Sequence, residues 1–233
     1  MHIMVYVHSL TGESGAGLFR SSALDGAIQV AKEIPDTRIT AVAMDRPNGD
    51  EVLRSSLALA ADAALLLQGP EFAVYDSVTL ACLLAGAVQA AEREQGPVDA
   101  VFCGDSDPGQ DGLGPALAGC LGWPQVTGAG QVGVTGNSLT VWRNWDDVSA
   151  LLRVETPCVI SFLPSGDPVS YPQLSRLMAA NQAEIPGRTV QSTPALQQTL
   201  SFSLRPQHRQ ALYRDNQEDM ELLVRALRAE QMI

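Results

Sequence analysis

The chain has 233 residues, of which 45% are apolar and 18% charged, and its formal net charge is −11. This is the composition of a globular chain that can bury a core without disulfides or a structural metal, and it excludes a wholly disordered protein. The acidic balance argues against nucleic-acid binding and against binding to anionic membranes, because both require a basic surface.

Short apolar runs alternate with helical patterns over the first two-thirds of the chain. Strands are predicted at Ile3–Val7, Ile39–Met44, Ala63–Leu67 and Ala100–Cys103. Helices are predicted at Ala23–Ile34, Glu51–Ala60, Ser77–Glu94 and Leu113–Leu121. The alternation predicts an α/β fold: a doubly wound, mostly parallel sheet with helices on both faces, of the adenine-nucleotide-binding type.

The pattern changes after Gln125. Two short apolar runs flank Gly136-Asn137, a turn pair typical of a hairpin, and a further strand is predicted at Val159–Leu163 and a helix at 172–183. Beyond Ile185 the chain is polar until a last predicted helix at 216–231. We therefore expect an α/β nucleotide-binding domain with its hairpin at 1–185, and a C-terminal arm and helix at 186–233 that pack on a partner subunit.

The four cysteines are widely spaced and the three histidines complete no zinc pattern, so no metal site is predicted. The simplest interpretation of the cysteines is small buried side chains in a reducing cytoplasm. The N-terminus lacks the pattern of a signal peptide, and the most apolar helical run, Val78–Ala91, is too short to span a membrane. We expect a cytoplasmic protein without a membrane span.

Ligands of open parallel sheets bind beyond the carboxyl ends of the strands. The loops after Val7, Met44 and Cys103 should meet there, and the third of these, Gly104–Pro115, is rich in glycine and aspartate and leads into a helix. It is either an anion-binding loop or an ordinary glycine-rich turn. The chain has neither a phosphate-binding G-x-x-x-x-G-K-[ST] motif nor a G-x-S-x-G nucleophile elbow, which favours a binding protein and predicts no catalytic residue.

An ordered series of motifs carries a family resemblance over about residues 1–185. Glu51–Asp62 resembles an E-x-L-R-x-A-L-A-M-G-A-D helix, and Gly109–Pro115 resembles a Gly-Gln-Val-Gly-Pro loop. A hairpin and the strand that follows it are matched by Leu139-x-Val141-x-Arg143 and by Glu155-x-Pro157-x-Val159. A later loop and helix are matched by Leu174, Leu177-Met178 and Ala180. Together they resemble the β subunit of electron transfer flavoproteins.

The resemblance implies an electron carrier subunit rather than an enzyme. It implies a heterodimer with an electron transfer flavoprotein α subunit, which holds most of the redox-active FAD. The pair would carry electrons from flavin dehydrogenases, with the acyl-CoA dehydrogenase type as one candidate, to an acceptor. The β-subunit cleft usually buries AMP, and in electron-bifurcating members a second FAD takes that place.

Site residues follow from the same resemblance. The adenine nucleotide is expected against Tyr6, Ser22, Ala23, Leu24, Asp25, Met44, Gly104, Asp105, Asp107, Gly109, Gln110, Gly112, Leu113 and Gly114. The amides of Gly109, Gly112 and Gly114 would contact the phosphate. Leu174 is expected to insert into a pocket of the partner dehydrogenase, the alternative being that it packs on its own helix.

Two alternatives remain open at this point. The first is a stand-alone adenine-nucleotide-binding regulatory domain of the universal-stress type. The second is a divergent β subunit that has lost the nucleotide. The second is motivated by Ser22-Ala23-Leu24-Asp25, which stands where the family commonly has Asn-Pro-x-Asp/Glu, and by Asp45, which replaces a usual glycine.

Overall fold

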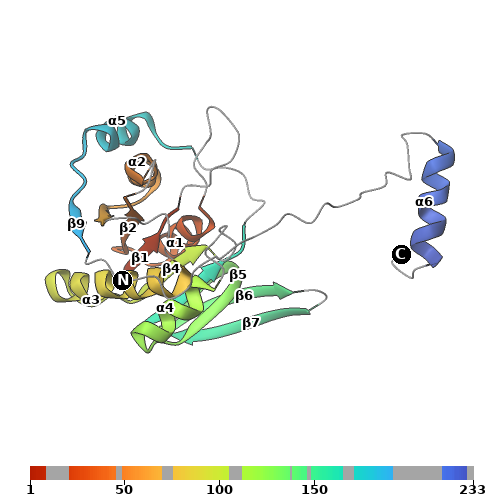
Figure 1. Cartoon of the computed structure of the whole chain (residues 1–233), viewed down its shortest axis with the longest axis horizontal. Helices are drawn as coiled ribbons and strands as arrows, with labels where there is room; N and C mark the ends of the chain where they lie inside the picture. The colour runs from red at the N-terminus through yellow and green to blue at the C-terminus, as the bar shows by residue number, and fades with distance from the viewer. Residues whose placement is uncertain are drawn as a thin grey trace. The chain divides into compact units, whose positions relative to one another are not determined.

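The computed structural model describes residues 1–8, 21–45, 49–69, 76–104, 112–136, 138–145, 148–164, 171–190 and 217–229 (Figure 1). The chain divides into two units, Met1–Gln198 and Thr199–Ile233. The described part of the second unit is helix α6 (Gln217–Ala229). Among the described residues, no helix is long and apolar enough to cross a membrane.

The described part of the first unit is built on a nine-stranded sheet with the order β7-β6-β5-β8-β4-β1-β2-β3-β9. Its strands are β1 (His2–Tyr6), β2 (Arg38–Met44), β3 (Ala63–Gln68), β4 (Ala100–Gly104), β5 (Gln125–Thr135), β6 (Ser138–Trp145), β7 (Val148–Glu155), β8 (Cys158–Phe162) and β9 (Gly187–Thr189). All neighbours pair in parallel except β5 with β6 and β6 with β7. The predicted α/β doubly wound fold is confirmed.

Four helices cover the two faces of the sheet. Helices α1 (Ser22–Glu33) and α2 (Gly49–Leu59) share one apolar core with Ile3 and Val5 of β1. Helices α3 (Ser77–Gln95) and α4 (Leu113–Leu121) share the other core with Met4 and Tyr6. The division follows from right-handed crossovers, because the chain moves outward from β1 to β3 and then returns past β1 to β4.

The predicted hairpin is confirmed and is longer than predicted. Strands β5 and β6 pair from Ala129↔Arg143 to Thr135↔Ser138, and Gly136 has a φ of +61°, as the first position of a tight hairpin turn requires. Helix α1 covers one edge of β5: the amide of Val134 donates to Glu33 Oε2 at 2.9 Å. This contact satisfies an amide on a strand edge that would otherwise be available for pairing with another chain.

Helix α5 (Leu174–Gln182) packs on α2 and buries only Ala180 of its residues (Figure 1). After α5 the chain returns to the sheet, where β9 pairs with β3 in the register Leu66↔Gly187 to Gln68↔Thr189. Residues beyond 185 therefore still contribute to the sheet.

The interpretation of the cysteines as buried side chains is right for two of them and wrong for the other two. Cys103 and Cys158 are buried in the sheet, and partial exclusion of water together with the nearby Asp99 raises the pKa of Cys158 to about 12. Cys82 and Cys120 are exposed on α3 and α4. In a helix as apolar as α3, apolar residues occur on both the buried and the exposed face. The exposure of a small side chain such as cysteine therefore cannot be predicted from the sequence there.

Candidate functional site

The candidate site lies at the carboxyl ends of β2, β1 and β4, which are neighbours in the sheet. The connection after β1 runs toward β2 through α1 on one face of the sheet, whereas the connection after β4 runs the other way, toward β5, through α4 on the opposite face. Such a reversal opens a crevice beyond the strand ends in doubly wound folds. The loops after Val7, Met44 and Cys103 were predicted from sequence to meet here, and their strands are adjacent.

The predicted residues from β1 and α1 divide between the two faces of the sheet. Tyr6 is buried in the core under α3 and α4, whereas Ala23 and Leu24 are buried in the core under α1 and α2. Because their side chains are committed to the core, Ala23 and Leu24 can offer a ligand only backbone groups. Ser22 and Asp25 are half-buried in the first turn of α1, whose preceding Ser21 side chain accepts the amide of Leu24 at 3.3 Å.

At the end of β2, Met44 is buried in the same core as Tyr6. The amide of the next residue, Asp45, donates to the carbonyl oxygen of Leu67 at 2.8 Å, so the backbone continues the β2–β3 pairing by one residue. The Asp45 side chain is exposed. Its negative charge therefore lies at the strand end where the resemblance expects a neutral glycine.

The end of β4 and the start of α4 supply the remaining described residues. Gly104 is half-buried, and Gly112 precedes α4 with a φ of +81°, a backbone conformation that favours glycine. Leu113 is buried under α4. A Cβ on Gly114 would lie 3.0 Å from the Ser161 side chain, so this glycine allows α4 to approach β8 closely.

The first turn of α4 is the feature of this site best suited to an anion. The N-cap residue of this helix is Gly112, which has no side chain with which to cap the first-turn amides. Amide groups at a helix N-terminus point away from the helix and attract negative charge. Four further predicted residues of this loop, Asp105, Asp107, Gly109 and Gln110, lie outside the described residues.

The predicted docking residue, Leu174, is the first residue of α5 and is 71% exposed. Tyr171, Leu177 and Met178 around it are also exposed. These four side chains, here called the α5 patch, lie within eight consecutive residues of the chain. Their exposure argues against the alternative in which Leu174 packs on its own helix.

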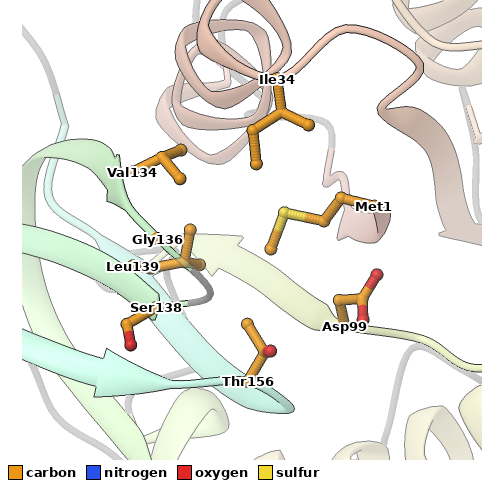
Figure 2. A pocket seen from close by; sticks show the side chains of 8 residues that line it. All are labelled: Met1, Ile34, Asp99, Val134, Gly136, Ser138, Leu139 and Thr156. Carbon is orange, nitrogen blue, oxygen red and sulfur yellow. The ribbon is translucent and has the colours of Figure 1, made fainter.

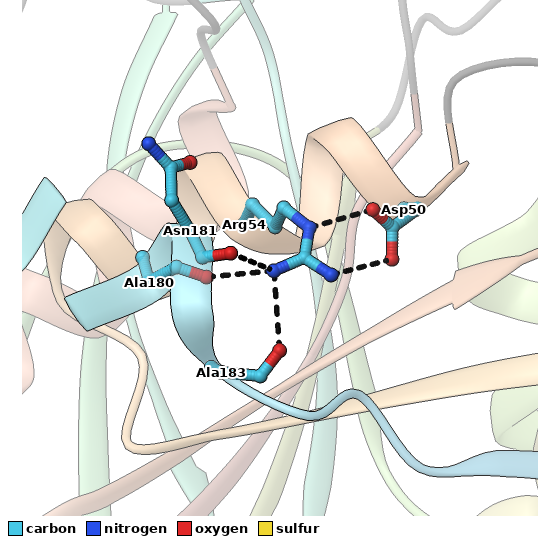
Figure 3. A network of polar contacts seen from close by, with 5 residues as sticks. All are labelled: Asp50, Arg54, Ala180, Asn181 and Ala183. Carbon is cyan, nitrogen blue, oxygen red and sulfur yellow. Dashed lines mark hydrogen bonds and ion pairs between the residues drawn. The ribbon is translucent and has the colours of Figure 1, made fainter. Parts of the chain in front are cut away.

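Arg54 has a positioning role that the sequence did not reveal. From α2, its Nη1 donates to the carbonyl oxygens of Ala180, Asn181 and Ala183 at 2.9, 2.9 and 3.1 Å, while Nε donates to Asp50 at 2.6 Å (Figure 3). These carbonyls lie at the end of α5, where helix carbonyls lack the amide of a following turn; of the three, Ala180 also accepts the amide of Ala183 at 3.3 Å. The spacing of four residues between Asp50 and Arg54 could have indicated their ion pair within α2. The contacts with the α5 carbonyls could not be predicted in this way, because those residues lie more than 120 positions away in the chain.

A cavity that the sequence did not predict lies at the opposite edge of the sheet, at the amino ends of the strands (Figure 2). It has a volume of about 480 Å³, and Met1 and Ile34 face Val134 and Leu139 of the hairpin across it. Asp99 also lines it, but this carboxylate accepts the amide of His2 at 2.7 Å. The cavity lies away from the candidate site, and the Asp99 carboxylate in its lining is already engaged, so the lining does not by itself specify a ligand.

Comparison with known proteins identifies the family. A family described as "Electron transfer flavoprotein domain" matches residues 17–193. The chain is 29% identical over 174 residues to the electron transfer flavoprotein subunit beta of Megasphaera elsdenii, covering 72% of this chain and 64% of that protein. It is 31% identical over 169 residues to the same subunit of Thermoanaerobacterium thermosaccharolyticum, covering 70% and 62%.

A third relative is the acryloyl-CoA reductase electron transfer subunit gamma of Anaerotignum propionicum, 30% identical over 144 residues, which cover 60% of this chain and 52% of that protein. The matched part of the chain thus spans less than two-thirds of the length of these relatives. The family match covers most of the chain, from before α1 to the end of β9. The chain therefore belongs to the electron transfer flavoprotein family, and the relatives that it resembles include beta subunits of these proteins.

Proposed function

We propose that this chain is the β subunit of an electron transfer flavoprotein, an electron carrier rather than an enzyme in its own right. It pairs with an FAD-bearing α subunit in the cytoplasm, and the pair takes electrons from a flavin dehydrogenase and passes them to an acceptor. The observation that carries the proposal is the family match over residues 17–193, combined with relatives that are themselves named beta subunits.

The proposed donor is a flavin enzyme acting on acyl-CoA compounds. One relative is named as an electron transfer subunit of an acryloyl-CoA reductase, which supports a partner of this chemical class. The α5 patch is the surface proposed to meet it, through Leu174. A single apolar anchor suits an electron-transfer encounter, which needs a small interface and rapid release.

AMP is the proposed structural ligand of the crevice, held against the residues that the resemblance assigned. The first turn of α4 after Gly112 supports this proposal, because its amides favour a phosphate. Ser22, Asp25 and the backbone of Ala23 and Leu24 lie at the start of α1, and Tyr6 and Met44 are buried on the α3–α4 side of the sheet. The negative charge of Asp45 repels the phosphate, and this repulsion lowers the affinity for AMP more strongly the closer the two groups lie.

The C-terminal segment 186–233 was expected to pack on a partner subunit; because residues 187–189 pair with β3 in this chain's own sheet, the part proposed to pack on the α subunit is the chain beyond β9, with helix α6. Within its own unit, α6 exposes Met220, Leu222 and Val224, although apolar side chains of a helix are normally covered in a complete assembly. This exposure supports a partner for α6, and the family supplies the α subunit as that partner.

The deciding experiment is co-expression of this chain with the α subunit, followed by a count of the bound groups. FAD is measured by absorbance after denaturation, and adenine nucleotides are identified by mass spectrometry of the supernatant. A stable αβ pair with one FAD and one AMP is the expected result. If a second FAD is found in place of AMP, the β-subunit assignment stands and FAD is the ligand of the crevice. If no nucleotide is found, the assignment also stands, but AMP is no longer the proposed ligand. A chain that binds no α subunit would overturn the assignment itself.

A further inference from the structure

Two exposed thiols lie together on the helical face formed by α3 and α4. Cys82 is in α3 and Cys120 in α4, and their sulfur atoms are 3.2 Å apart. Both residues are exposed and both are free thiols. The other two cysteines, Cys103 and Cys158, are buried and are therefore shielded from reagents in solution.

The distance between the two sulfurs is short for atoms that are not bonded. A disulfide bond measures about 2.05 Å, so a change of roughly 1 Å would join them, which side-chain rotation on two packed helices can supply. The two cysteines are 38 positions apart in the chain, so no local spacing motif indicates that they meet. Their meeting depends on the packing of α3 against α4.

The surroundings of Cys120 disfavour its thiolate form. Partial burial of its sulfur, followed in importance by the hydrogen bond with Cys82, raises the pKa of the Cys120 thiol to about 11. Cys120 therefore keeps its proton at neutral pH and can donate it toward the Cys82 sulfur. A thiolate is the form of cysteine that attacks an oxidant. Because the two sulfurs are 3.2 Å apart, each lies within reach of the other, and we take Cys82 as the attacking sulfur and Cys120 as the resolving one.

We propose that Cys82 and Cys120 form an oxidation site, at which a peroxide converts the two thiols into an intrachain disulfide that joins α3 to α4. The Cys82 thiolate attacks one peroxide oxygen and breaks the O–O bond, which leaves a sulfenic acid on Cys82 and releases one water with the proton that Cys82 gave up. The Cys120 sulfur then attacks the Cys82 sulfur. The S–S bond forms, the S–O bond breaks, and the oxygen leaves as a second water with the Cys120 proton. Two thiols are oxidised by two electrons, and one peroxide is reduced to two waters.

The disulfide would close a loop that contains the rest of α3, the whole of β4 and most of α4. A cross-link of this span restricts the unfolded chain much more than the folded one, in which the sulfurs are already close. We expect the oxidised protein to melt roughly 5–10 °C above the reduced protein. The restriction applies to the folded state as well, because α4 can then no longer move away from α3.

The test is a peroxide titration of the reduced chain, read by thiol counting and by non-reducing peptide mapping. The expected result is the loss of two of the four thiols, a mass lower by two hydrogen atoms, and a linked pair of peptides that carry Cys82 and Cys120. Dithiothreitol should restore all the thiols. Cys103→Ala is the matched control, since it removes a buried thiol and should still form the link.

The variants Cys82→Ser and Cys120→Ser should form no intrachain link, and neither should gain melting temperature on oxidation. Cys82→Ser should also retain its Cys120 thiol at peroxide concentrations that oxidise the wild type. The proposal is overturned if the wild type forms only disulfide-linked dimers, if it accumulates sulfinic acid on Cys82 without a link, or if it keeps all its thiols at peroxide concentrations that oxidise glutathione. Each of these outcomes is read on the unmodified sequence and does not depend on whether a variant folds.

Discussion

Arg54 of α2 donates from Nη1 to the carbonyl oxygen of Ala180 at 2.9 Å, and this bond joins α2 to α5 through two residues that are 126 positions apart in the chain. The same nitrogen reaches two further carbonyls at the end of α5, so one guanidinium satisfies three backbone acceptors. A cation at this position also opposes the partial negative charge of a helix C-terminus. Since α5 buries only Ala180 of its own residues, Arg54 is a main part of what holds it in place.

Replacing Arg54 by methionine should therefore loosen α5 while keeping the aliphatic stem against α2. We expect a loss of roughly 1–2 kcal/mol in the free energy of unfolding, because the bonds are charge-assisted but partly exposed to water. Amide hydrogen exchange should accelerate across α5. Asp50→Asn is the matched control: it removes the partner at i−4 and leaves the carbonyl contacts, and should cost only about 0.3–0.5 kcal/mol. Equal effects of the two changes would show that the carbonyl contacts contribute nothing.

The exposed Leu174 should matter for electron transfer and not for folding. In the αβ pair, Leu174→Ala is expected to lower kcat/KM for reduction by the dehydrogenase about ten- to hundredfold, the equivalent of one buried leucine. Flavin content and melting temperature should stay within error of the wild type, because this side chain is 71% exposed in the chain alone. Stopped-flow reduction of the flavin measures the rate.

Leu151→Ala serves as the control for this test, since Leu151 is 60% exposed on β7 and lies outside the α5 patch. Its rate of reduction per bound flavin should be that of the wild type. A wild-type rate in Leu174→Ala would remove the docking role and leave the β-subunit assignment intact. Early melting of that variant would mean that Leu174 stabilises the fold.

The parallel part of the fold could be predicted from the sequence because its strands are buried on both faces. Continuous apolar runs such as Ile3–Val7 and Ala100–Cys103 reflect that burial directly. Strand β7 was missed, because only Val154 of its residues is buried and the sequence there lacks a continuous apolar run. Strand β9 was missed because it is only three residues long and joins the sheet edge through backbone pairing with β3. Such pairing does not require a pattern of apolar side chains.

The candidate site was predictable only in part, for a related physical reason. Strand order brings the ends of β1, β2 and β4 together, and that order follows from general rules of crossover handedness. The contacts of Arg54 and the meeting of Cys82 with Cys120 depend instead on how two helices pack. Residues that meet where two helices pack have no fixed spacing in the sequence, so a local motif cannot predict these contacts.

Gly26 should not tolerate a side chain. A Cβ at this position of α1 would overlap the ring of Phe162, with Cε1 only 2.6 Å away, and that ring already packs on Phe102 with centroids 5.1 Å apart. Gly26→Ala should therefore cost about 2–3 kcal/mol of stability in chemical denaturation. Gly86→Ala is the matched change in α3, where a Cβ meets nothing within 4 Å. It should be neutral or raise stability by up to about 1 kcal/mol, and a loss of the same size at both positions would rule out the overlap as the cause.

His2 should make the stability of the fold depend on pH on the acid side of neutrality. Burial, followed by the positive charge of Arg38, lowers the pKa of His2 below its usual 6.5, although Asp99 acts in the opposite direction. The folded chain therefore holds His2 neutral, with Nε2 2.9 Å from Thr40 Oγ1, while the unfolded chain takes up a proton near pH 6.5. The contribution of neutral His2 to the free energy of unfolding is therefore fully present above pH 6.5. It is lost as the pH falls toward the lowered pKa that His2 has in the folded chain. Melting temperatures measured between pH 8 and pH 5 should fall more steeply for the wild type than for His2→Gln, which cannot take up a proton. Parallel profiles for the two proteins would assign the acid sensitivity to other groups.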